Sequence, residues 1–440
     1  MVMSFPKLSL FPHTAEIDSE GHLVIGACDT VKLAAGFATP LYIFDEQTLR
    51  DKCVEIRTEM STRYHDVLVI YASKAFLNPA LVQLIQEEHL GLDVVSGGEL
   101  SIAASSAFPM SHVYFHGNNK DTEELALALD LGVARVVVDN FREISLLNSL
   151  SGKHGTRQDI LLRLSPEVDP HTHAYITTGT LRSKFGFPIS YGHAEQAVIQ
   201  AMAASNLNLI GLHFHVGSSL LEVRPYTEAI DICLRFAAQM REKHGLELRE
   251  FGVGGGFAIS YTMDCPAPPI AQFAEAITSS VLGLCNQLSL PLPRLIVEPG
   301  RSIVGQAGVA LYTVGGEKEI PGVCHYVFVD GGMADNMRPA LYGSKYEALV
   351  ANKGRDAELE EVTIAGKFCE SGDILVENAR IAKVQPGDLI AIPACGAYSL
   401  SLCNNYNAAL KPAIAIVKEG QARLIRRRET YEDLTRSDVY

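Results

Sequence analysis

The stretch Val67-Leu68-Val69-Ile70-Tyr71-Ala72-Ser73-Lys74 decides the fold of this chain. Six apolar residues in a row are typical of a strand in a parallel sheet, which is buried on both faces. A helix-like stretch, 79–90, opens with a proline shortly afterwards, so we expect Lys74 at the carboxyl end of the strand, where α/β folds bind ligands. Two readings of Lys74 stay open. In the first, apolar surroundings disfavour the ammonium form, so the amine can attack a carbonyl. In the second, the side chain only extends from a strand end into water.

Seven more strand-like runs follow, and amphipathic helical stretches separate most of them. Eight strand–helix units within roughly 250 residues are typical of a TIM-like (β/α)8 barrel. The sequence therefore predicts an α/β protein built on such a barrel. The eight predicted strands are 68–72, 91–95, 113–115, 135–138, 160–164, 209–214, 248–253 and 294–297.

Polar residues and glycines gather where these predicted strands end. Because the carboxyl ends of barrel strands surround the active site in this fold, we expect a functional site there. The residues at these ends are Lys74, Asp93, His116, Asp139, Arg163, His215, the glycines 254–256 and the segment 298–301.

The sequence changes in character after Arg301. Short strand-like runs punctuated by glycine and proline turns replace the helical periodicity, and they predict a mostly antiparallel, β-barrel-like C-terminal domain. We expect three parts: an N-terminal segment, 1–40, that packs with the β domain, a barrel over 41–302 and the β domain over 303–440. The predicted β-domain strands are 309–314, 326–329, 361–364, 389–392 and 413–417.

The composition is that of an ordinary globular protein, with 20% charged residues and a net charge of −14. The acidic balance disfavours nucleic acid or an anionic membrane as a partner. No apolar stretch approaches the roughly 20 residues of a membrane span, and the N-terminus lacks the features of a signal peptide. Nine cysteines without Cys-x-x-Cys spacing suit reduced thiols, so we expect a cytoplasmic protein.

A triple glycine, 254–256, follows the seventh predicted strand. Glycines let backbone N–H groups approach a phosphate closely, although a tight turn would need the same residues. Arg301 follows the eighth strand and could add a charge-assisted contact. Because strands seven and eight form the usual phosphate corner of this fold, we expect a phosphate-bearing ligand here.

His215 ends the sixth predicted strand. Its imidazole could stack on a planar ring, and Ser218 nearby could bond a phosphate. A barrel metallohydrolase is the rival reading, because His213 and His215 share one face of the strand and could bind a metal. Glu298 could keep a pyridine nitrogen protonated, or it could pair with Arg301 instead.

The segment 368–373, Phe-Cys-Glu-Ser-Gly-Asp, is a compact acidic turn with a thiol at Cys369. A positioned thiol can donate a proton to carbon, whereas a lone cysteine is more often structural. Tyr398 lies in a polar, aromatic stretch late in the β domain, which an exposed loop would explain equally well.

Taken together and in order, these segments resemble the alanine-racemase-like (fold-type III), pyridoxal-phosphate-dependent decarboxylases. The likeness covers nearly the whole chain, and it is greatest to the diaminopimelate decarboxylase subgroup. The motifs of the family are Tyr-Ala-Ser-Lys-Ala at 71–75, His-Phe-His-Val-Gly-Ser at 213–218, Gly-Gly-Gly-Phe at 254–257, Glu-Pro-Gly-Arg at 298–301 and Cys-Glu-Ser-Gly-Asp at 369–373. The subgroup is indicated by the segments 338–343, 426–434, 169–173 and 183–186 and by Glu370 after Cys369.

The resemblance implies pyridoxal 5'-phosphate as cofactor and decarboxylation of meso-2,6-diaminopimelate to L-lysine and CO2, the last step of lysine biosynthesis. Lys74 would hold the cofactor covalently, and Cys369 would protonate the reacting carbon. The implied cofactor-binding residues are Lys74, His215, Ser218, Gly254, Gly255, Gly256, Glu298, Pro299, Gly300, Arg301 and Tyr398. The implied substrate-binding residues are Arg301, Arg338, Tyr342, Glu370 and Tyr398, and no metal is implied.

The resemblance also implies a homodimer in which Cys369 and Glu370 reach the site of the second subunit. The sequence departs from the subgroup's usual pattern at Lys345-Tyr346, where an aromatic residue and a histidine are frequent, and at Ser399, where glycine is frequent. These departures leave the details of substrate fit open. The alternatives are a decarboxylase of ornithine, arginine or D-lysine type, a metallohydrolase using His213 and His215, and a cofactor-binding protein without decarboxylase chemistry.

Overall fold

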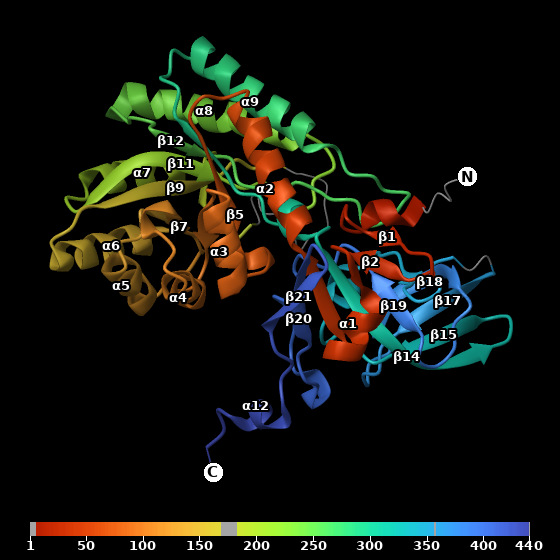
Figure 1. Cartoon of the computed structure of the whole chain (residues 1–440). Helices are drawn as coiled ribbons and strands as arrows, with labels where there is room; N and C mark the ends of the chain where they lie inside the picture. Colours follow the sequence, from red (N-terminus) through yellow and green to blue (C-terminus); the bar gives the residue numbers. More distant parts are fainter. Residues whose placement is uncertain (1–5, 169–182, 356–357, 440) are drawn as a thin grey trace. The chain divides into compact units, whose positions relative to one another are not determined.

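The computed structural model describes residues 6–168, 183–355 and 358–439, which belong to two units (Figure 1). The barrel unit comprises Cys53–Ala258 and Pro268–Ser302. The β unit comprises Met1–Lys52, Ile259–Ala267 and Ile303–Tyr440.

The barrel unit contains eight parallel strands that close into a ring. β13 pairs with β5 and β8 pairs with β9, so the sheet of this barrel has no free edge between its first and last strands. All eight predicted strands are present, and the TIM-like barrel is confirmed. The strands are β5 (Val67–Ala72), β6 (Gly91–Val94), β7 (Val113–Phe115), β8 (Arg135–Val138), β9 (Gln158–Ser165), β11 (Leu207–Phe214), β12 (Glu250–Gly252) and β13 (Arg294–Val297).

Helices follow the barrel strands, and short polar residues cap the start of several of them. Asn78, Ser96, Asp121 and Asn140 each accept a backbone N–H at a helix start, which fixes where the chain leaves the barrel rim. The last two long helices, α8 and α9, pack side by side (Figure 1). The helices of this unit are α3 (Pro79–Glu87), α4 (Gly97–Ser105), α5 (Thr122–Asp130), α6 (Phe141–His154), α7 (His193–Ala203), α8 (Arg224–His244) and α9 (Ile270–Gln287), and α2 (Glu46–Ser61) crosses the boundary between the units.

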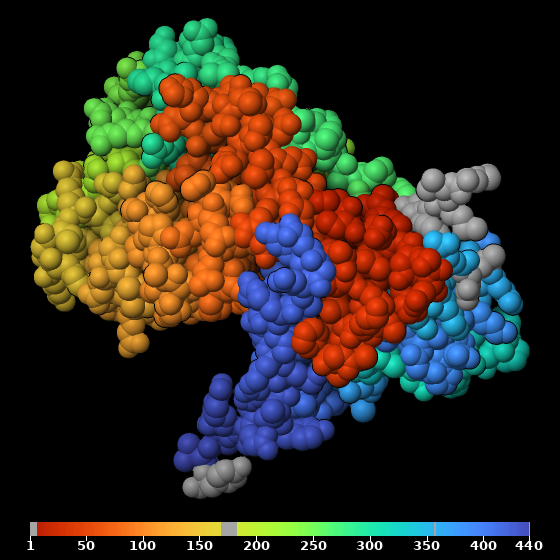
Figure 2. Space-filling model, in the orientation of Figure 1, coloured from red at the N-terminus to blue at the C-terminus, as the bar shows by residue number. Residues whose placement is uncertain are grey.

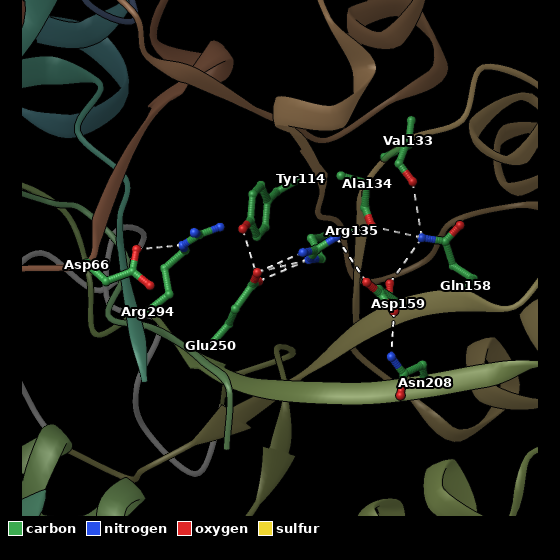
Figure 3. A network of polar contacts seen from close by, with 10 residues as sticks. All are labelled: Asp66, Tyr114, Val133, Ala134, Arg135, Gln158, Asp159, Asn208, Glu250 and Arg294. Atoms are coloured by element: carbon green, nitrogen blue, oxygen red, sulfur yellow. Dashed lines mark hydrogen bonds and ion pairs between the residues drawn. The ribbon is translucent and has the colours of Figure 1, made fainter. Parts of the chain in front are cut away.

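The inside of the barrel changes from charged to apolar along its axis. Its middle is a cluster of Ile70, Tyr114, Val137, Leu161, Ile210 and Ile296. At the amino ends of the strands, Glu250 accepts hydrogen bonds from Arg135 and from the Tyr114 hydroxyl, at 2.9 Å to Arg135 Nη2 and 3.0 Å to the hydroxyl (Figure 3). Arg135 also lies 3.1 Å from Asp159. This polar floor closes one end of the barrel and leaves the carboxyl end for ligands.

The β unit is built on a mostly antiparallel sheet, as predicted. Two pairings, β15 with β17 and β4 with β20, are parallel, and the other pairings of this sheet are antiparallel. The strands are β4 (Leu41–Asp45), β14 (Gly308–Ile320), β15 (Cys324–Val329), β16 (Leu349–Val350), β17 (Leu359–Ala365), β18 (Ile374–Ala382), β19 (Leu389–Ile392), β20 (Ala413–Lys418) and β21 (Gln421–Arg426).

The strand β4 lies in a different unit from the one assigned by the sequence. A barrel beginning at residue 41 would include it, but β4 pairs with β14 on one side and β20 on the other. All five residues of this strand are buried, as barrel strands also are, so its apolar pattern alone does not distinguish the two units. The segment 259–267, also within the predicted barrel, likewise belongs to the β unit.

The N-terminal segment forms a small sheet of its own, followed by one helix. Its strands are β1 (Glu16–Ile17), β2 (Leu23–Ile25) and β3 (Cys28–Asp29), and its helix is α1 (Thr30–Phe37). Phe11, Leu23 and Ile25 share one hydrophobic cluster with Val309 and Val417 of the large sheet. The N-terminal segment is thus part of the core of the β unit.

Candidate functional site

Lys74 lies in a single 3-10 turn, Ser73–Ala75, that continues directly from β5. Its side chain is half-buried at the carboxyl end of the barrel. Asp93 on β6 is almost fully buried and interacts electrostatically with Lys74. Burial raises the pKa of Asp93 to about 8, against the opposing charge of Lys74. The amine therefore lies beside a carboxyl group that holds its proton unusually tightly.

A carboxylate flanked by two imidazoles lies at the end of the next strand in the ring, β13. Nε2 of His213 is 3.1 Å from each carboxylate oxygen of Glu298, and Nε2 of His116 is 3.3 Å from one of them. Burial alone would raise the pKa of Glu298, but His213 and His116 outweigh it, and the pKa lies well below its ordinary value. Burial lowers the pKa of His116 well below its ordinary value. Glu298 is thus a buried carboxylate that stays ionised.

His215 lies just beyond the end of β11, beside the triple glycine. The backbone N–H of Gly255 donates to its Nδ1 at 3.4 Å, which leaves the proton of a neutral ring on Nε2. Burial, followed by the charge of Lys74, lowers the pKa of His215 well below its ordinary value. His215 is therefore a neutral ring held in one tautomer.

The glycines 254–256 leave no room for side chains. A Cβ on Gly255 would lie 1.8 Å from the carbonyl oxygen of Glu298, and one on Gly256 would lie 2.1 Å from that of Gly217. Gly254 and Gly256 also have positive φ angles, of 69° and 105°, which disfavour other residues. These constraints bring bare backbone to the rim of the barrel, as a phosphate-binding loop requires.

The remaining barrel-unit residues of the predicted site lie next to this loop. Arg301 donates from Nη2 to the Ser218 hydroxyl at 3.0 Å. The carbonyl of Pro299 accepts the backbone N–H of Ala72 at 3.0 Å, and a Cβ on Gly300 would lie 3.0 Å from that of Ala72. Segment 298–301 is thus tied to the strand that carries Lys74.

These barrel-unit residues fit pyridoxal phosphate. The glycine backbone with Arg301 and Ser218 offers donors to a phosphate, the ionised Glu298 suits a protonated ring nitrogen, and Lys74 offers an amine to an aldehyde. The structure adds Asp93 and His116, which were predicted at strand ends but were given no catalytic or binding role. Their position at strand ends was visible in the sequence, but their partners, Lys74 and Glu298, were not.

The metal reading of His213 and His215 does not match this geometry. The described residues contain a group of His116, His213 and Glu298 whose ligand atoms lie within 4.8 Å of one another, and His215 is not part of it. His213 is directed to Glu298 instead, and Nδ1 of His215 faces the Gly255 N–H. The two histidines predicted as a ligand pair thus serve different partners.

The other predicted site residues belong to the β unit. Arg338 and Tyr342 are the two ends of the short helix α11 (Arg338–Tyr342), with Arg338 buried and Tyr342 half-buried. Tyr398 is half-buried and has a positive φ of 64°, so it sits in a tight turn. The subgroup segment 169–173 falls outside the described residues.

Cys369 and Glu370 lie on an exposed turn that is well anchored. The carboxylate of Asp373, itself buried, accepts the backbone N–H of Phe368 at 2.7 Å and that of Met333 at 2.6 Å. The Tyr406 hydroxyl donates to Glu370 at 2.6 Å. The turn thus presents a thiol and a carboxylate to the outside from a fixed backbone.

Comparisons with known proteins agree with this site. Residues 47–305, more than half of the chain, match the family model of the pyridoxal-dependent decarboxylase, pyridoxal binding domain. The chain is 43% identical to diaminopimelate decarboxylase of Bacillus subtilis and 42% identical to that of Synechocystis, over 98% of its own length and 98% and 93% of theirs. The structure of diaminopimelate decarboxylase from M. jannaschii in complex with L-lysine superimposes with a TM-score of 0.91 at 35% identity, covering 98% of both chains. The chain belongs to the family of pyridoxal-phosphate-dependent decarboxylases, and within it to the diaminopimelate decarboxylases.

Proposed function

We propose that the chain decarboxylates meso-2,6-diaminopimelate to L-lysine and CO2 with pyridoxal 5'-phosphate, as the last step of lysine biosynthesis. The observation that carries the reaction type is the barrel rim, where Lys74 and the ionised Glu298 lie beside a bare glycine backbone. The substrate is supported by similarity along the whole chain to diaminopimelate decarboxylases.

The barrel unit would hold the cofactor. Lys74 would bind it covalently through its amine, and the neutral His215 would stack on its ring. Glu298 would keep the ring nitrogen protonated. The phosphate would contact the backbone of Gly254, Gly255 and Gly256 together with Ser218, Pro299, Gly300, Arg301 and Tyr398. When bound, the cofactor supplies an electron sink for the pair left behind when CO2 departs.

The β unit would bind the distal end of the substrate, which does not react. Arg338, with Arg301, Tyr342 and Tyr398, would bind the distal carboxylate, and Glu370 the distal ammonium. An amine without a distal carboxylate would leave the buried Arg338 guanidinium without a counter-charge, at a cost of roughly 1–3 kcal/mol or more. This argues against a related decarboxylase whose substrate, ornithine or lysine, has only an amine at that end.

Cys369 would deliver a proton to the α-carbon after CO2 leaves, and it would do so in the site of a second subunit. The Cys369 and Glu370 side chains are exposed, which leaves them accessible to another copy. Large apolar side chains of the same unit are exposed as well, including Val323, Leu359 and Leu424. The C-terminal segment, blue in Figure 2, lies on the visible face of the molecule. These features support a homodimer with shared sites.

We also propose a cytoplasmic location, because the nine cysteines are all free thiols. Among the described residues, no helix combines the length and the apolar character that a bilayer span needs.

One assay tests the proposed function. CO2 release is measured with the purified, cofactor-loaded protein on meso-, LL- and DD-diaminopimelate, lysine, ornithine and arginine. We expect turnover on the meso isomer to exceed turnover on the last three by at least about a hundredfold. A clear preference for ornithine or arginine would overturn the substrate, and release from none of the six compounds would overturn the reaction.

A further inference from the structure

The guanidinium of Arg338 is buried in a cage of hydroxyls and aromatic rings. It donates from Nη1 to the Tyr346 hydroxyl and from Nη2 to the Ser344 hydroxyl, the latter at 3.2 Å. Its carbon Cζ lies 4.5 Å from the ring centre of Tyr261 and 5.5 Å from that of Tyr346. Arg338 and Tyr346 are each 4% exposed. The cage therefore shields most of the guanidinium from water.

All of these partners are electrically neutral. Among the residues that the structure describes, the polar partners shown for Arg338 are hydroxyls, with no carboxylate among them. Burial raises the pKa of Tyr346 above its ordinary value, so this phenol stays protonated. A carboxylate in its place would neutralise the guanidinium, whereas a hydroxyl orients it and leaves its positive charge for an anionic ligand.

Tyr346 is itself held in place from a second segment of the β unit. The Ser399 hydroxyl lies near enough to Tyr346 to affect its pKa, and it donates to Oδ1 of Asn336 at 3.1 Å. The rings of Tyr346 and Tyr261 meet edge to face, with centres 5.3 Å apart. Ser399 directly follows Tyr398, so the Tyr346 hydroxyl lies near a second segment that carries a predicted site residue.

We propose that Tyr346 is a positioning residue that fixes the Arg338 guanidinium and thereby sets the selectivity for ligands with a distal carboxylate. The inference rests on the proposed function, because it takes Arg338 as the group that reads this carboxylate. Loss of the Tyr346 hydroxyl should weaken the binding of molecules that carry the carboxylate and leave otherwise similar molecules unaffected.

L-lysine and cadaverine make a matched pair for the test, because they differ only in the carboxylate. Their dissociation constants are measured on the cofactor-loaded wild-type protein, on Tyr346→Phe and on the control Tyr326→Phe, a tyrosine of the same unit that stacks on Phe328. We expect Tyr346→Phe to weaken L-lysine roughly tenfold or more and to leave cadaverine within about twofold. The control should change neither.

A second comparison tests whether Tyr346 acts through Arg338. In the Arg338→Gln background, the added Tyr346→Phe change should no longer alter the ratio of the lysine and cadaverine dissociation constants. If Tyr346→Phe left this ratio unchanged in the wild-type background, for example by weakening both ligands equally, the inference would be overturned. These outcomes differ from failure of the proposed function, in which the wild-type protein itself releases no CO2 from meso-diaminopimelate.

Discussion

His213 and Glu298 are joined inside the barrel, with Nε2 of the imidazole 3.1 Å from each carboxylate oxygen. Both side chains are buried, and His116 adds a second imidazole 3.3 Å from the same carboxylate. A buried carboxylate without such neighbours would hold a proton at neutral pH. The arrangement therefore keeps a negative charge at the carboxyl end of β13, where we propose that a cationic ring nitrogen is held.

Replacement of Glu298 by glutamine tests the need for this charge. The amide keeps the shape of the side chain but cannot stabilise a protonated ring nitrogen, so we expect kcat to fall at least about a hundredfold. The protein should still bind the cofactor, because Lys74 and the glycine loop are unchanged. Steady-state kinetics and cofactor content are the measurements, and kcat within a few-fold of wild type would contradict the role of Glu298.

Asp93→Asn should change how stability depends on pH. The pKa of Asp93 in the folded protein is about 8, above its ordinary value of 3.8, so the folded protein keeps a proton that the unfolded chain releases between these values. The stability of the wild-type protein therefore falls as pH rises through this window, and the asparagine variant lacks this loss.

Urea unfolding of the cofactor-free proteins at pH 5, 6, 7 and 8 provides the measurement. We expect the free energy of unfolding of Asp93→Asn, relative to wild type, to increase steadily with pH. A difference that stays flat or shrinks would show that the Asp93 carboxyl is ionised throughout.

Cys369→Ala should slow turnover far more than it weakens substrate binding. A proton donor contributes about 10²–10⁴ to the rate, so we expect kcat to fall by at least a hundredfold while KM stays within a few-fold. Cys265→Ala is the control, because Cys265 is also an exposed thiol of the β unit. If both changes lowered kcat only slightly and equally, Cys369 would not be the proton donor.

Shared sites predict that two inactive variants restore each other. When Lys74→Ala and Cys369→Ala subunits exchange at equal amounts, half of the dimers are mixed, and each mixed dimer has one complete site. We expect recovery of about a quarter of the wild-type activity. If mass spectrometry shows mixed dimers but activity stays at the level of the single variants, the sites are not shared.

Glu250→Gln tests the floor of the barrel (Figure 3). Arg135 loses its charged acceptor Glu250 but keeps Asp159, so we expect a loss of about 1.5–3 kcal/mol in the free energy of unfolding. Glu247→Gln is the control, since its ion pair with Arg249 is exposed and should cost less than about 1 kcal/mol. The activity of folded Glu250→Gln should match wild type, because the floor lies at the end of the strands opposite Lys74. A similar loss of stability in both variants would contradict the structural role of Glu250.

The sequence predicted the barrel well because parallel strands are buried on both faces and appear as continuous apolar runs, as in 67–72. Polar strand ends such as Lys74 and Glu298 were visible for the same reason. The strands that pair with β4 could not be predicted, because an apolar run does not indicate which strands lie next to it in a sheet. The strand β21 was also missed, because its residues are half-buried or exposed and carry charges.

The partners of individual side chains were beyond the sequence because they come from distant segments. Arg338 lies between the rings of Tyr346 and Tyr261, and Tyr261 comes 77 positions before Arg338 in the chain. Similarly, His116 and Glu298 meet only when the barrel closes. Such contacts depend on tertiary packing, which local patterns do not encode.

The central claim is that the amine of Lys74 carries the cofactor, and borohydride reduction followed by peptide mapping tests it most directly. Reduction makes the link between an amine and the cofactor aldehyde permanent. We expect the pyridoxyl group on the peptide that contains Lys74 in fully loaded wild-type protein, and no such label in Lys74→Ala. Recovery of that wild-type peptide without the label, or of the label on another lysine, would contradict the account.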